Sequence, residues 1–350
     1  MIFHKKLISW YLQNKRSMPW RETVDPYRIW LSEIILQQTR VAQGLPYYLS
    51  FVEAYPTVFD LANAQQEEVL KLWQGLGYYS RARNLHETAQ FVANELQGVF
   101  PSSYKELLKL KGVGDYTASA IASICYGEVV PVVDGNVYRV LSRYFNIDTP
   151  INSTKGIKKF KELASTLIDT KNPANYNQAI MEFGALQCKP QSPYCIICPL
   201  NEGCEALKNG TVTSLPVKLK KVKVKNRYFN YLIFNIDGNK TVIQQRTGKG
   251  IWQNLYEFPV IESSAKIDID GITGDQGFMD LMNGMDYEIS LYQEEYVIHK
   301  LSHQHLYTRF YIVEIQKNPL ISEEQKVIHV STIAQYPVPI LLGKFIDRFY

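Results

Sequence analysis

The stretch Leu110-Lys111-Gly112-Val113-Gly114-Asp115-Tyr116-Thr117-Ala118 predicts a tight turn followed by the start of a helix. Gly112 and Gly114 permit the turn, because glycine adopts backbone angles that other residues avoid. The first N–H groups of the following helix lack partners within it, so they suit a phosphate oxygen. A Gly-x-Gly pair alone is weak evidence, and a plain connection between two helices explains it equally well. The surrounding motifs therefore have to decide.

An acidic residue stands at the entrance of the next helical pattern. The stretch Val132-Val133-Asp134-Gly135-Asn136-Val137-Tyr138-Arg139-Val140 places Asp134 before an amphipathic run. Taken alone, Asp134 is best interpreted as a helix N-cap. Further helices are predicted from apolar spacing throughout the first 215 residues. The segments that carry this spacing are Ile29–Val41, Val69–Leu76, Ala118–Cys125, Val137–Tyr144 and Ile157–Leu167.

Four of the five cysteines lie close together, with the spacing Cys188-x6-Cys195-x2-Cys198-x5-Cys204. Four thiolates this near in sequence can surround one metal centre. Zinc favours two C-x2-C pairs, and only one pair here has that spacing. A [4Fe–4S] cluster is therefore the first choice and structural zinc the second. The fifth, Cys125, sits in an apolar run and is interpreted as a core residue.

Length and charge suggest two domains of unlike character. At roughly 100–200 residues per domain, 350 residues make about two. The net charge of +4 permits nucleic acid as a partner without requiring it. Residues 1–227 carry 28 basic and 19 acidic side chains, whereas residues 228–350 carry 10 and 15. No apolar run approaches the ~18 residues of a membrane span, and the start, Met1-Ile-Phe-His-Lys-Lys, lacks the apolar core expected of a secretory signal. We expect a cytoplasmic protein, associated with the nucleoid if bacterial.

The composition changes after residue 215. Residues 216–227 hold six basic side chains and no acidic one, which predicts a solvated linker, a phosphate-facing tether, or both. Beyond it, strands are predicted at 228–234, 241–246 and 306–315, with Asp237-Gly-Asn as a turn. Helices are predicted at 275–285 and 340–349. The second domain, 228–350, is therefore predicted to be α+β.

Three features follow one another along the chain: the glycine hairpin, Asp134 at a helix entrance, and the cysteine cluster. This order resembles that of the helix–hairpin–helix DNA glycosylases that carry an iron–sulfur cluster. Four further motifs are similar to those of the MutY family of adenine DNA glycosylases. They are Met18-Pro-Trp-Arg21, Trp30-Leu-Ser-Glu-Ile-Ile-Leu-Gln-Gln-Thr39, Gly75-Leu-Gly-Tyr-Tyr79 and Asn177-Gln-Ala-Ile-Met-Glu-Phe-Gly-Ala185. The resemblance spans residues 7–205 and continues more loosely through 228–350. It implies an all-α helix–hairpin–helix glycosylase domain (1–215) with one [4Fe–4S] cluster, the linker 216–227, and a Nudix-like 8-oxoguanine recognition domain (228–350).

The implied reaction removes adenine paired with 8-oxoguanine, and also with guanine, from double-stranded DNA by a monomeric enzyme that flips the base out. Glu33 is the implied acid, and its apolar neighbours are expected to raise its pKa toward neutrality. Asp134 would face the cationic sugar, electrostatically or through a transient covalent adduct. Asn136 would hold Asp134 or a catalytic water, or otherwise cap the same helix. Without the resemblance, Glu33 would be interpreted as a surface residue of an amphipathic helix.

Position 116 separates related activities. Bifunctional glycosylases of the endonuclease III type carry a lysine here, which cuts the strand through a Schiff base. Because a phenol forms no Schiff base, Tyr116 predicts a monofunctional enzyme, in which it could hydrogen-bond near Asp134. The remaining recognition residues follow from the resemblance. Arg16, Trp20 and Gln178 match the adenine pocket, Arg21 lies next to it, and Gln38, Thr39, Leu76 and Tyr78 match positions near the opposite base, Tyr78 as a wedge.

The second domain has the Nudix-like stretch Gly250-Ile-Trp-Gln-Asn-Leu-Tyr-Glu-Phe-Pro259 but lacks the acidic metal-binding helix, so pyrophosphate hydrolysis is not expected. In the family, a Phe-Ser-His loop reads the oxidised guanine. Here Ser302 and His303 match this loop, Ser302 toward the purine edge and His303 toward a phosphate. Leu301 replaces the aromatic residue, which puts that contact with DNA in doubt.

Two other functions compete with adenine removal. One is a glycosylase for a damaged pyrimidine on the same scaffold. The other is a DNA-binding protein without catalysis, in which the iron–sulfur cluster is structural. The Nudix-like domain favours adenine removal over the first alternative. The presence of both Glu33 and Asp134 argues against the second.

Overall fold

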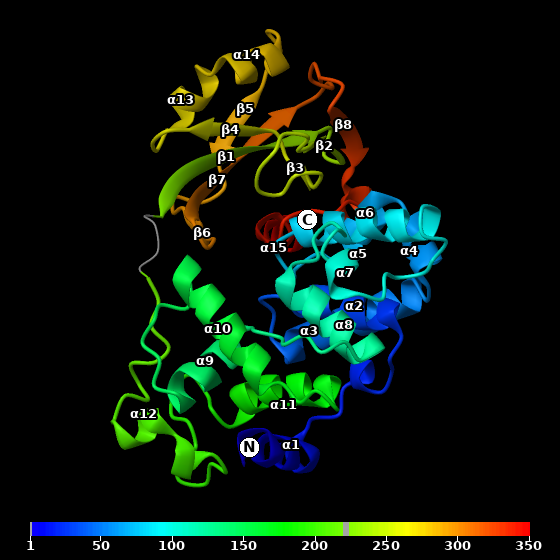
Figure 1. Cartoon of the computed structure of the whole chain (residues 1–350). Helices are drawn as coiled ribbons and strands as arrows, with labels where there is room; N and C mark the ends of the chain where they lie inside the picture. The colour runs from blue at the N-terminus through cyan, green and yellow to red at the C-terminus, as the bar shows by residue number, and fades with distance from the viewer. Residues whose placement is uncertain (1, 220–223) are drawn as a thin grey trace. The chain divides into compact units, whose positions relative to one another are not determined.

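The computed structural model describes residues 2–219 and 224–350 (Figure 1). Contacts divide these residues into two units. The first holds residues up to 63 together with 84–219, and the second holds 64–83 together with 224–350. The domain limits taken from composition stay a prediction. Residues 220–223 of the predicted linker lie outside the described residues, and the strand β1 (Lys225–Ile236) already includes the linker's last three residues.

The first unit is helical, as predicted. Its elements are α1 (Ile2–Asn14), η1 (Pro19–Arg21), α2 (Pro26–Leu36), α3 (Val41–Ala54), α4 (Val58–Asn63), the greater part of α6 (Ser80–Asn94), α7 (Tyr104–Leu107), α8 (Asp115–Tyr126), α9 (Gly135–Tyr144), α10 (Thr154–Leu167), α11 (Pro173–Leu186), η2 (Asn201–Gly203) and α12 (Glu205–Lys208).

Local sequence sets the limits of the helices that carry the site. Asp25 caps α2 by accepting a hydrogen bond from the Tyr27 amide, and Pro26 stands in the first turn, where its missing N–H costs nothing. Gly127 ends α8 in the left-handed conformation. Asp134 caps α9, as the sequence predicts.

Two predicted helices are shorter than their apolar spacing suggests. The run Ile29–Val41 is split, because α2 ends at Leu36, Gln38 has a left-handed backbone (φ 57°) and Val41 begins α3. The run Val69–Leu76 is split as well. Its helix α5 (Gln66–Leu72) stops before Gly75 and Gly77, whose φ angles are 101° and 74°. Apolar residues thus continue past a helix end without continuing the helix.

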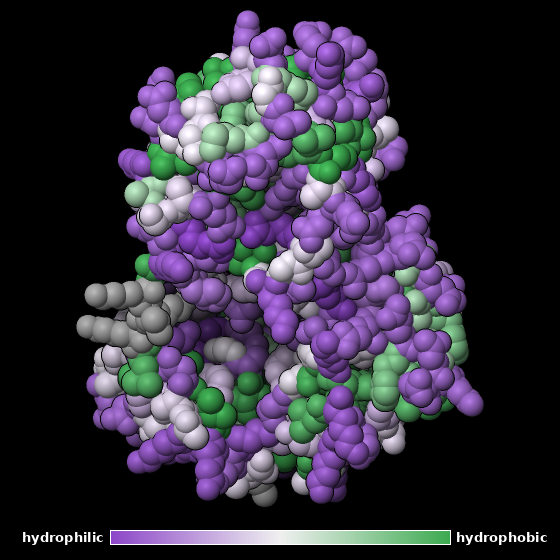
Figure 2. Space-filling view, turned by 90° about the horizontal axis from the view of Figure 1, so that it is seen from above, coloured by the Kyte–Doolittle hydropathy of each residue, from purple (hydrophilic) through white to green (hydrophobic). Residues whose placement is uncertain are grey.

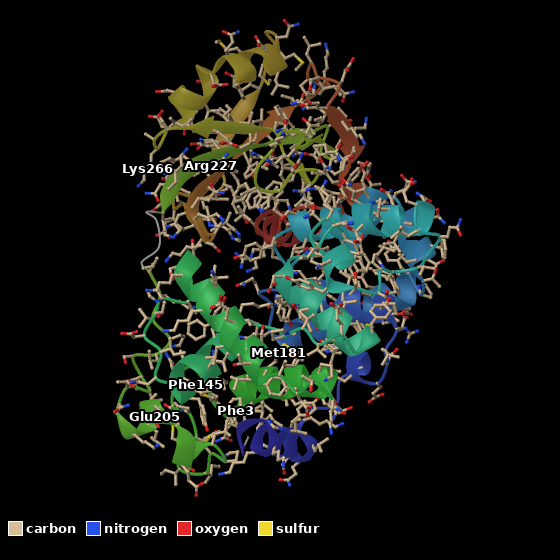
Figure 3. The ribbon with its side chains drawn as sticks, viewed as in Figure 1. Phe3, Phe145, Met181, Glu205, Arg227 and Lys266 are labelled. Carbon is tan, nitrogen blue, oxygen red and sulfur yellow. The ribbon has the colours of Figure 1, made fainter. Side chains whose placement is uncertain are left out.

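The core of the first unit joins distant parts of the sequence. Buried side chains of α1, α9, α10 and α11 pack together, among them Leu7, Leu141, Phe160 and Phe183. Phe3 and Phe145 adjoin this core with ring centres 6.1 Å apart, and Met181 of α11 packs against it too (Figure 3). Contacts of α2 and α11 with α8 bring the predicted site residues of these helices together.

The second unit is built on a mixed sheet, in the part of the chain that is described. Its order is β3-β2-β1-β7-β5, with β4 on β1, β6 on β7 and β8 on β2, and β1 runs parallel to β7 from end to end. The strands are β1 (Lys225–Ile236), β2 (Lys240–Gln245), β3 (Tyr256–Glu257), β4 (Val260–Ser263), β5 (Glu288–Leu291), β6 (Val297–Lys300), β7 (Gln304–Ile315) and β8 (Gln325–His329). The helices are α5, α13 (Ile269–Thr273), α14 (Gln276–Met282), η3 (Val330–Gln335) and α15 (Ile340–Phe349).

Helices cover both faces of this sheet. Ile272 of α13 and Phe278 of α14 pack on one face against β1 and β7 side chains such as Leu232 and Val313. On the other face, the Phe345 ring of α15 stacks on Phe310 with centres 4.0 Å apart. This arrangement confirms the predicted α-and-β second domain and its predicted helices at 275–285 and 340–349.

The surface facing the viewer in Figure 2 is mostly hydrophilic, with hydrophobic residues in separate groups. Among the described helices, none has the length and apolar character needed to cross a membrane.

Candidate active site and DNA-binding surface

A cavity of about 440 Å³ opens where α2 and the starts of α8 and α9 meet. Glu33, Tyr116 and Asp134 line it together. Tyr116 and Asp134 stand 18 positions apart at the starts of consecutive helices, whereas Glu33 comes from α2, more than 80 positions earlier, so the fold brings the three together. The other residues that line the cavity are Leu36, Gln37, Gln38, Gly114, Asp115, Thr117 and Gly135.

Glu33 is a buried carboxyl group, 8 % exposed, on the inner face of α2. Burial raises its pKa from the ordinary 4.5 to about 7. A hydrogen bond with Tyr116 and the Arg21 guanidinium oppose this rise, whereas the nearby Asp134 carboxylate adds to it. The sequence-based expectation of a pKa near neutrality thus has a structural cause. A carboxyl group with this pKa can hold a proton at neutral pH and give it to a base.

Tyr116 is the second residue of α8, and its partly buried side chain lies near the carboxyl groups of Glu33 and Asp134. Burial raises its pKa well above 10, and Glu33 and Asp134 raise it further. The hydroxyl therefore stays protonated and bonds to Glu33, and it also lies 3.5 Å from the sulfur of Met181. The sequence suggested a bond near Asp134, and the structure gives Glu33 as the bonded carboxyl.

The start of α9, the helix that Asp134 caps, fixes the position of the Asp134 carboxylate. Its carboxylate accepts hydrogen bonds from the amides of Asn136 (2.9 Å) and Val137 (2.8 Å) and from the Asn136 side chain (2.7 Å). Burial raises the pKa of Asp134, and these bonds oppose the rise because they favour the ionised form. The Asn136 side chain thus holds Asp134, one of the roles that the sequence left open.

A second layer fixes Asn136. The Arg139 guanidinium donates to Asn136 Oδ1 (2.8 Å) and to the Gly184 carbonyl (2.7 Å). Gly184 of α11 approaches Asn136 so closely that a Cβ there would lie 2.6 Å from the Asn136 Cβ and 2.9 Å from its carbonyl oxygen. Because there is no room for a side chain at position 184, the backbone of α11 packs directly against the start of α9.

Glu182 was missed by the sequence analysis, although it lies in the motif Asn177–Ala185. It is a buried carboxylate on α11 that binds both Arg16 and Arg21. Arg16 donates to it through Nε (2.8 Å) and Nη2 (2.6 Å), and Arg21 through Nη1 (3.1 Å) and Nη2 (2.9 Å). Burial raises the pKa of Glu182, but these bonds outweigh it and lower the pKa to about 2. An acidic residue inside an apolar helical run was the available signal.

The predicted adenine-pocket residues come from two places, Arg16 and Trp20 from the segment between α1 and α2, and Gln178 from α11. The Trp20 ring is buried against Tyr48, with centres 5.0 Å apart and the rings edge to face. Gln178 accepts a hydrogen bond from the Tyr11 hydroxyl (3.4 Å). Arg16, Trp20 and Gln178 are not among the described residues that line the cavity. Arg21 is the link, because its charge acts on Glu33.

The hairpin glycines behave as the turn requires. Gly112 has a φ of +76°, and a Cβ there would lie 2.8 Å from the Asn84 Cβ. Gly114 caps α8, and a Cβ on it would meet open space. The glycine turn therefore leaves the start of α8 accessible, as an anion-binding role needs.

Two predicted opposite-base residues follow the end of α2. Gln38 lines the same cavity, and the Thr39 amide donates a hydrogen bond to the Leu36 carbonyl (3.1 Å).

Within the second unit, two of the predicted opposite-base residues, Leu76 and Tyr78, share one cavity of about 460 Å³ with the loop predicted to read the oxidised guanine. It is lined by Leu76 and Tyr78 from the 64–83 segment and by Leu301, Ser302 and His303 from the loop between β6 and β7. The Tyr78 hydroxyl and Ser302 Oγ lie 2.6 Å apart, in hydrogen-bonding contact. The sequence assigned these residues to one surface although 224 positions separate them, and the structure brings them together.

Cys188, Cys195, Cys198 and Cys204 line one small cavity with Arg143. The four are free thiols, and burial raises the pKa of Cys198 to about 11, an effect to which the other three cysteines add. Mutual repulsion of this kind is relieved when a cation binds. Arg143 donates to the carbonyls of Lys189 (2.7 Å) and Pro190 (3.0 Å), which fixes the loop after Cys188. Among the described residues, the side chains are not gathered tightly enough to hold a single metal ion.

Comparison with known proteins agrees with this geometry. Residues 31–165 match the HhH-GPD superfamily of base excision DNA repair proteins, and residues 230–348 match the NUDIX domain. The chain is 33 % identical over 331 residues to the adenine DNA glycosylase of Buchnera aphidicola subsp. Baizongia pistaciae, covering 94 % of this chain and 90 % of that protein. The chain belongs to the MutY family of adenine DNA glycosylases.

Membership of the adenine DNA glycosylase family makes the chain an enzyme, a DNA N-glycosylase. The human adenine DNA glycosylase is 46 % identical over 213 residues, which is 58 % of this chain and 39 % of that protein. Among solved structures, a thermostable thymine-DNA glycosylase superposes with a TM-score of 0.55 at 31 % identity, covering 59 % of this chain and 96 % of that one. An endonuclease III–DNA complex, at 22 % identity and a TM-score of 0.52, shows the same fold.

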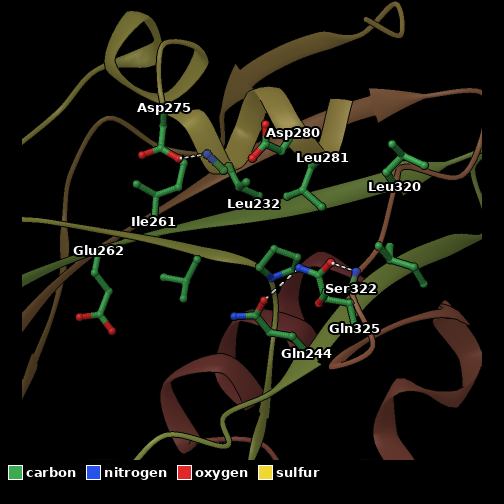
Figure 4. Close-up of a pocket in the computed structure, with 14 residues that line it drawn as sticks. Leu232, Gln244, Ile261, Glu262, Asp275, Asp280, Leu281, Leu320, Ser322 and Gln325 are labelled. Carbon is green, nitrogen blue, oxygen red and sulfur yellow. Dashed lines mark hydrogen bonds between the residues drawn. The ribbon is translucent and has the colours of Figure 1, made fainter. Parts of the chain in front are cut away.

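The Nudix-like domain of this adenine DNA glycosylase family member contains a further cavity of about 580 Å³ (Figure 4). Its carboxylates are engaged in structural roles. Asp275 accepts from the amides of Gly277 and Phe278 and caps α14, while Glu262 pairs with Arg227 and Arg246. Gln325 of β8 donates to Gln244, its paired neighbour on β2 (3.2 Å). The sequence-based expectation that this domain does not hydrolyse pyrophosphate stays a prediction.

Proposed function

We propose that this protein flips adenine out of double-stranded DNA, where it is paired with 8-oxoguanine or with guanine, and hydrolyses its glycosidic bond. The observation that carries the proposal is the cavity in which Glu33 and Asp134 face each other with unlike surroundings. Glu33 is buried with its pKa near 7, whereas Asp134 is hydrogen-bonded as a carboxylate. Two carboxyl groups in such different surroundings can divide acid and anion roles.

The reaction follows from these positions. Protonated Glu33 donates its proton to a ring nitrogen of the flipped adenine, which makes the base a better leaving group. As the bond between the sugar and the base breaks, the Asp134 carboxylate stabilises the positive charge that develops on the sugar, electrostatically or through a transient covalent adduct. Water then adds to the sugar, and ionised Glu33 accepts its proton. Tyr116 keeps Glu33 in place through its hydrogen bond.

The same geometry favours a monofunctional enzyme. Schiff-base chemistry needs an amine at the sugar, and the residue at position 116 is a phenol whose pKa is raised well above 10, so it stays protonated. We therefore propose that the protein leaves the strand intact after it removes the base.

Recognition of the mispair is assigned to two surfaces. Arg16, Trp20, Gln178 and Arg21 would form the adenine side, ordered by Glu182. Tyr78 would enter the base stack beside the opposite base, with Gln38, Thr39 and Leu76 nearby, and Ser302 and His303 would contact the purine edge and a phosphate. The direct bond between Tyr78 and Ser302 supports a shared surface. The net charge of +9 on residues 1–227 would hold the phosphate backbone nonspecifically.

The four-cysteine loop is proposed to hold a [4Fe–4S] cluster. Cys188, Cys195, Cys198 and Cys204 would each supply a thiolate, and the bound cluster would tie the loop to α9 and α11. The spacing of the four cysteines, with a single C-x2-C pair, favours the cluster over zinc. Absorption by the purified protein in the visible range, together with iron and zinc analysis, decides between them.

The test is a duplex with a single adenine opposite 8-oxoguanine, incubated with the protein and then treated with alkali to reveal abasic sites. We expect adenine release that requires alkali for strand cleavage. Parallel duplexes carry adenine opposite guanine and thymine opposite guanine, because the structural relative named above acts on thymine. Release of thymine without release of adenine would establish a pyrimidine glycosylase instead. Strand cleavage without alkali would contradict the role given to Tyr116.

A further inference from the structure

The segment that delivers Asp134 is an extended stretch, residues 127–133, between the end of α8 and the start of α9. One side of it is held by Asn177 of α11. The Asn177 side chain accepts from the Val132 amide (3.1 Å) and donates to the Val130 carbonyl (2.9 Å) and to Ser123 Oγ of α8 (2.9 Å). Asn177 is fully buried.

The adjacent carbonyl, that of Pro131, is bonded instead to Lys161 of α10. Its ammonium group lies 2.8 Å from the Pro131 carbonyl, 3.0 Å from Asp115 Oδ2 and 3.1 Å from Ser119 Oγ. An ammonium group has three donors, which matches these acceptors. The Lys161 side chain is only 26 % exposed and also lies over the Tyr104 ring, 5.4 Å from its centre.

Asp115 is the partner that connects this lysine to the site. It is the first residue of α8, it adjoins Tyr116 and it lines the cavity. Its other carboxylate oxygen accepts a hydrogen bond from the Tyr104 hydroxyl (2.5 Å). Both oxygens of Asp115 are therefore bonded, one to α7 and one to α10. Pro131, at the far end of the lysine contact, stands three residues before Asp134.

We infer that Lys161 is a positioning residue for the reaction proposed above, on which this inference rests. Its ammonium group ties the start of α8, which carries Tyr116 and through it Glu33, to the segment that ends at Asp134. We call Lys161, Asp115, Ser119 and the Pro131 carbonyl the lysine clamp. Because the clamp spans the two elements that carry the reacting groups, it sets the distance between the acid and the anion across the cavity. Displacement of a reacting group by about 1 Å can cost on the order of 100-fold in rate.

The neighbouring lysines of α10 give a matched control. Lys158 is 79 % exposed, and its contact is with Glu162 on the same helix at 3.9 Å. Lys158→Met removes the same charge from the same helix as Lys161→Met. Nonspecific attraction to DNA phosphates therefore changes alike in both variants. A difference between them reports the contacts of the clamp.

The experiment measures two quantities in the full chain with each substitution. The first is the single-turnover rate constant for adenine release, together with the affinity for the same duplex. We expect Lys161→Met to lower the rate constant by about 10-fold or more, while its affinity follows that of Lys158→Met. Lys161→Arg, which keeps the charge in a different shape, should give an intermediate rate constant.

The second quantity is hydrogen–deuterium exchange in the free protein over residues 127–137. These residues include the amides of Asn136 and Val137, which bond to Asp134. We expect faster exchange there in Lys161→Met than in Lys158→Met, with little difference in α1 or in β7. This comparison does not depend on catalysis. If the unaltered protein releases no adenine, the proposed function fails and the exchange data alone decide on the clamp.

Two results would overturn the inference. One is equal exchange over residues 127–137 in Lys161→Met and Lys158→Met. The other is a loss that lies wholly in duplex affinity, with the rate constant unchanged, which would make Lys161 a phosphate contact. A double substitution with Asp115→Asn sharpens the result. Within one clamp, the losses of Lys161→Met and Asp115→Asn should not add, whereas independent sites would add.

Discussion

Glu33 and Glu182 are both buried glutamates of the helical unit, yet their surroundings shift their pKa values in opposite directions. Glu33 lies on α2 beside a phenol and a second carboxylate, and burial raises its pKa to about 7. Glu182 lies on α11 between two arginines that donate to both of its oxygens, and its pKa falls to about 2. Burial is common to both, so the neighbouring groups decide which glutamate can carry a proton and which is a fixed negative charge.

Arg21 connects the two regions. It is bonded to Glu182, and its charge also moderates the pKa of Glu33. Glu182 therefore does more than pair with Arg16, because it holds Arg21 at the distance from which it acts on Glu33. The ionised cluster of Glu182, Arg16 and Arg21 thus adjoins the site in which Glu33 can carry a proton. The following changes test this difference between the two glutamates.

The largest expected effect is on catalysis by Glu33. Glu33→Gln removes the proton that adenine needs, so the single-turnover rate constant should fall by about 1000-fold, within the range for general acid–base catalysis. Binding to a duplex with adenine opposite 8-oxoguanine should persist, as measured by fluorescence anisotropy. Glu53→Gln, which changes an exposed glutamate on α3, is the control. Loss of duplex binding in Glu33→Gln would make Glu33 a structural residue.

Glu182→Gln should have the largest effect on stability. It leaves Arg16 and Arg21 without the carboxylate that both bind, and breaking a buried ion pair costs about 3–5 kcal/mol. The arginines are partly exposed, 37 % and 14 %, so we expect about 2–3 kcal/mol less free energy of unfolding in urea. The stabilisation is present above pH 4.5 and is lost as the pH falls through 2. A difference that persists undiminished below pH 2 would contradict the ionic explanation.

In contrast to Glu182→Gln, Glu33→Gln should increase the free energy of unfolding at high pH. The folded protein binds the Glu33 proton more tightly than the unfolded chain does, so the free energy of unfolding decreases as the pH rises from 4.5 through 7. The substitution removes this penalty. At pH 8 the variant should be more stable than the unaltered protein by about 1–3 kcal/mol, and at pH 4.5 the two should agree. A variant that is less stable at pH 8 would place Glu33 among the ionised, paired carboxylates.

The smallest effect concerns a position that touches neither glutamate. Gly184→Ala places a Cβ against Asn136, whose backbone has to shift. We expect a loss of about 1 kcal/mol in stability, typical of an overpacked contact, and about a 10-fold lower rate constant because Asp134 moves with Asn136. Gly210→Ala meets open space, but its φ of +69° makes it a control for backbone strain only. An unchanged rate constant would show that Asp134 is held independently of α11.

The parts of this account that the sequence predicted are local ones. The cap at Asp134, the hairpin at Gly112 and Gly114, and the helix that carries Glu33 all follow from patterns within a few residues. The helix ends predicted at Val41 and Leu76 were wrong. The helices end at Leu36 and Leu72, before left-handed residues that apolar spacing does not reveal. The family resemblance, and not periodicity, singled out Glu33 among the other glutamates.

The parts that the sequence did not reveal depend on distant partners. Glu182 becomes a positioning residue only when α11 meets Arg16 and Arg21, more than 160 positions earlier. Lys161 looks like one of several lysines on an amphipathic helix until Asp115 and the Pro131 carbonyl are seen beside it. The association of residues 64–83 with the second unit has the same origin, since Tyr78 finds Ser302 only in the folded chain.

The pH dependence of adenine release tests the central claim most directly, which is that Glu33 carries the reacting proton because its surroundings raise its pKa. The single-turnover rate constant should be measured from pH 5.5 to 9 on a duplex with adenine opposite 8-oxoguanine. We expect a single ionisation near pH 7, above which the rate constant falls by about tenfold per pH unit. A rate constant that stays level from pH 6 to 9 would contradict it.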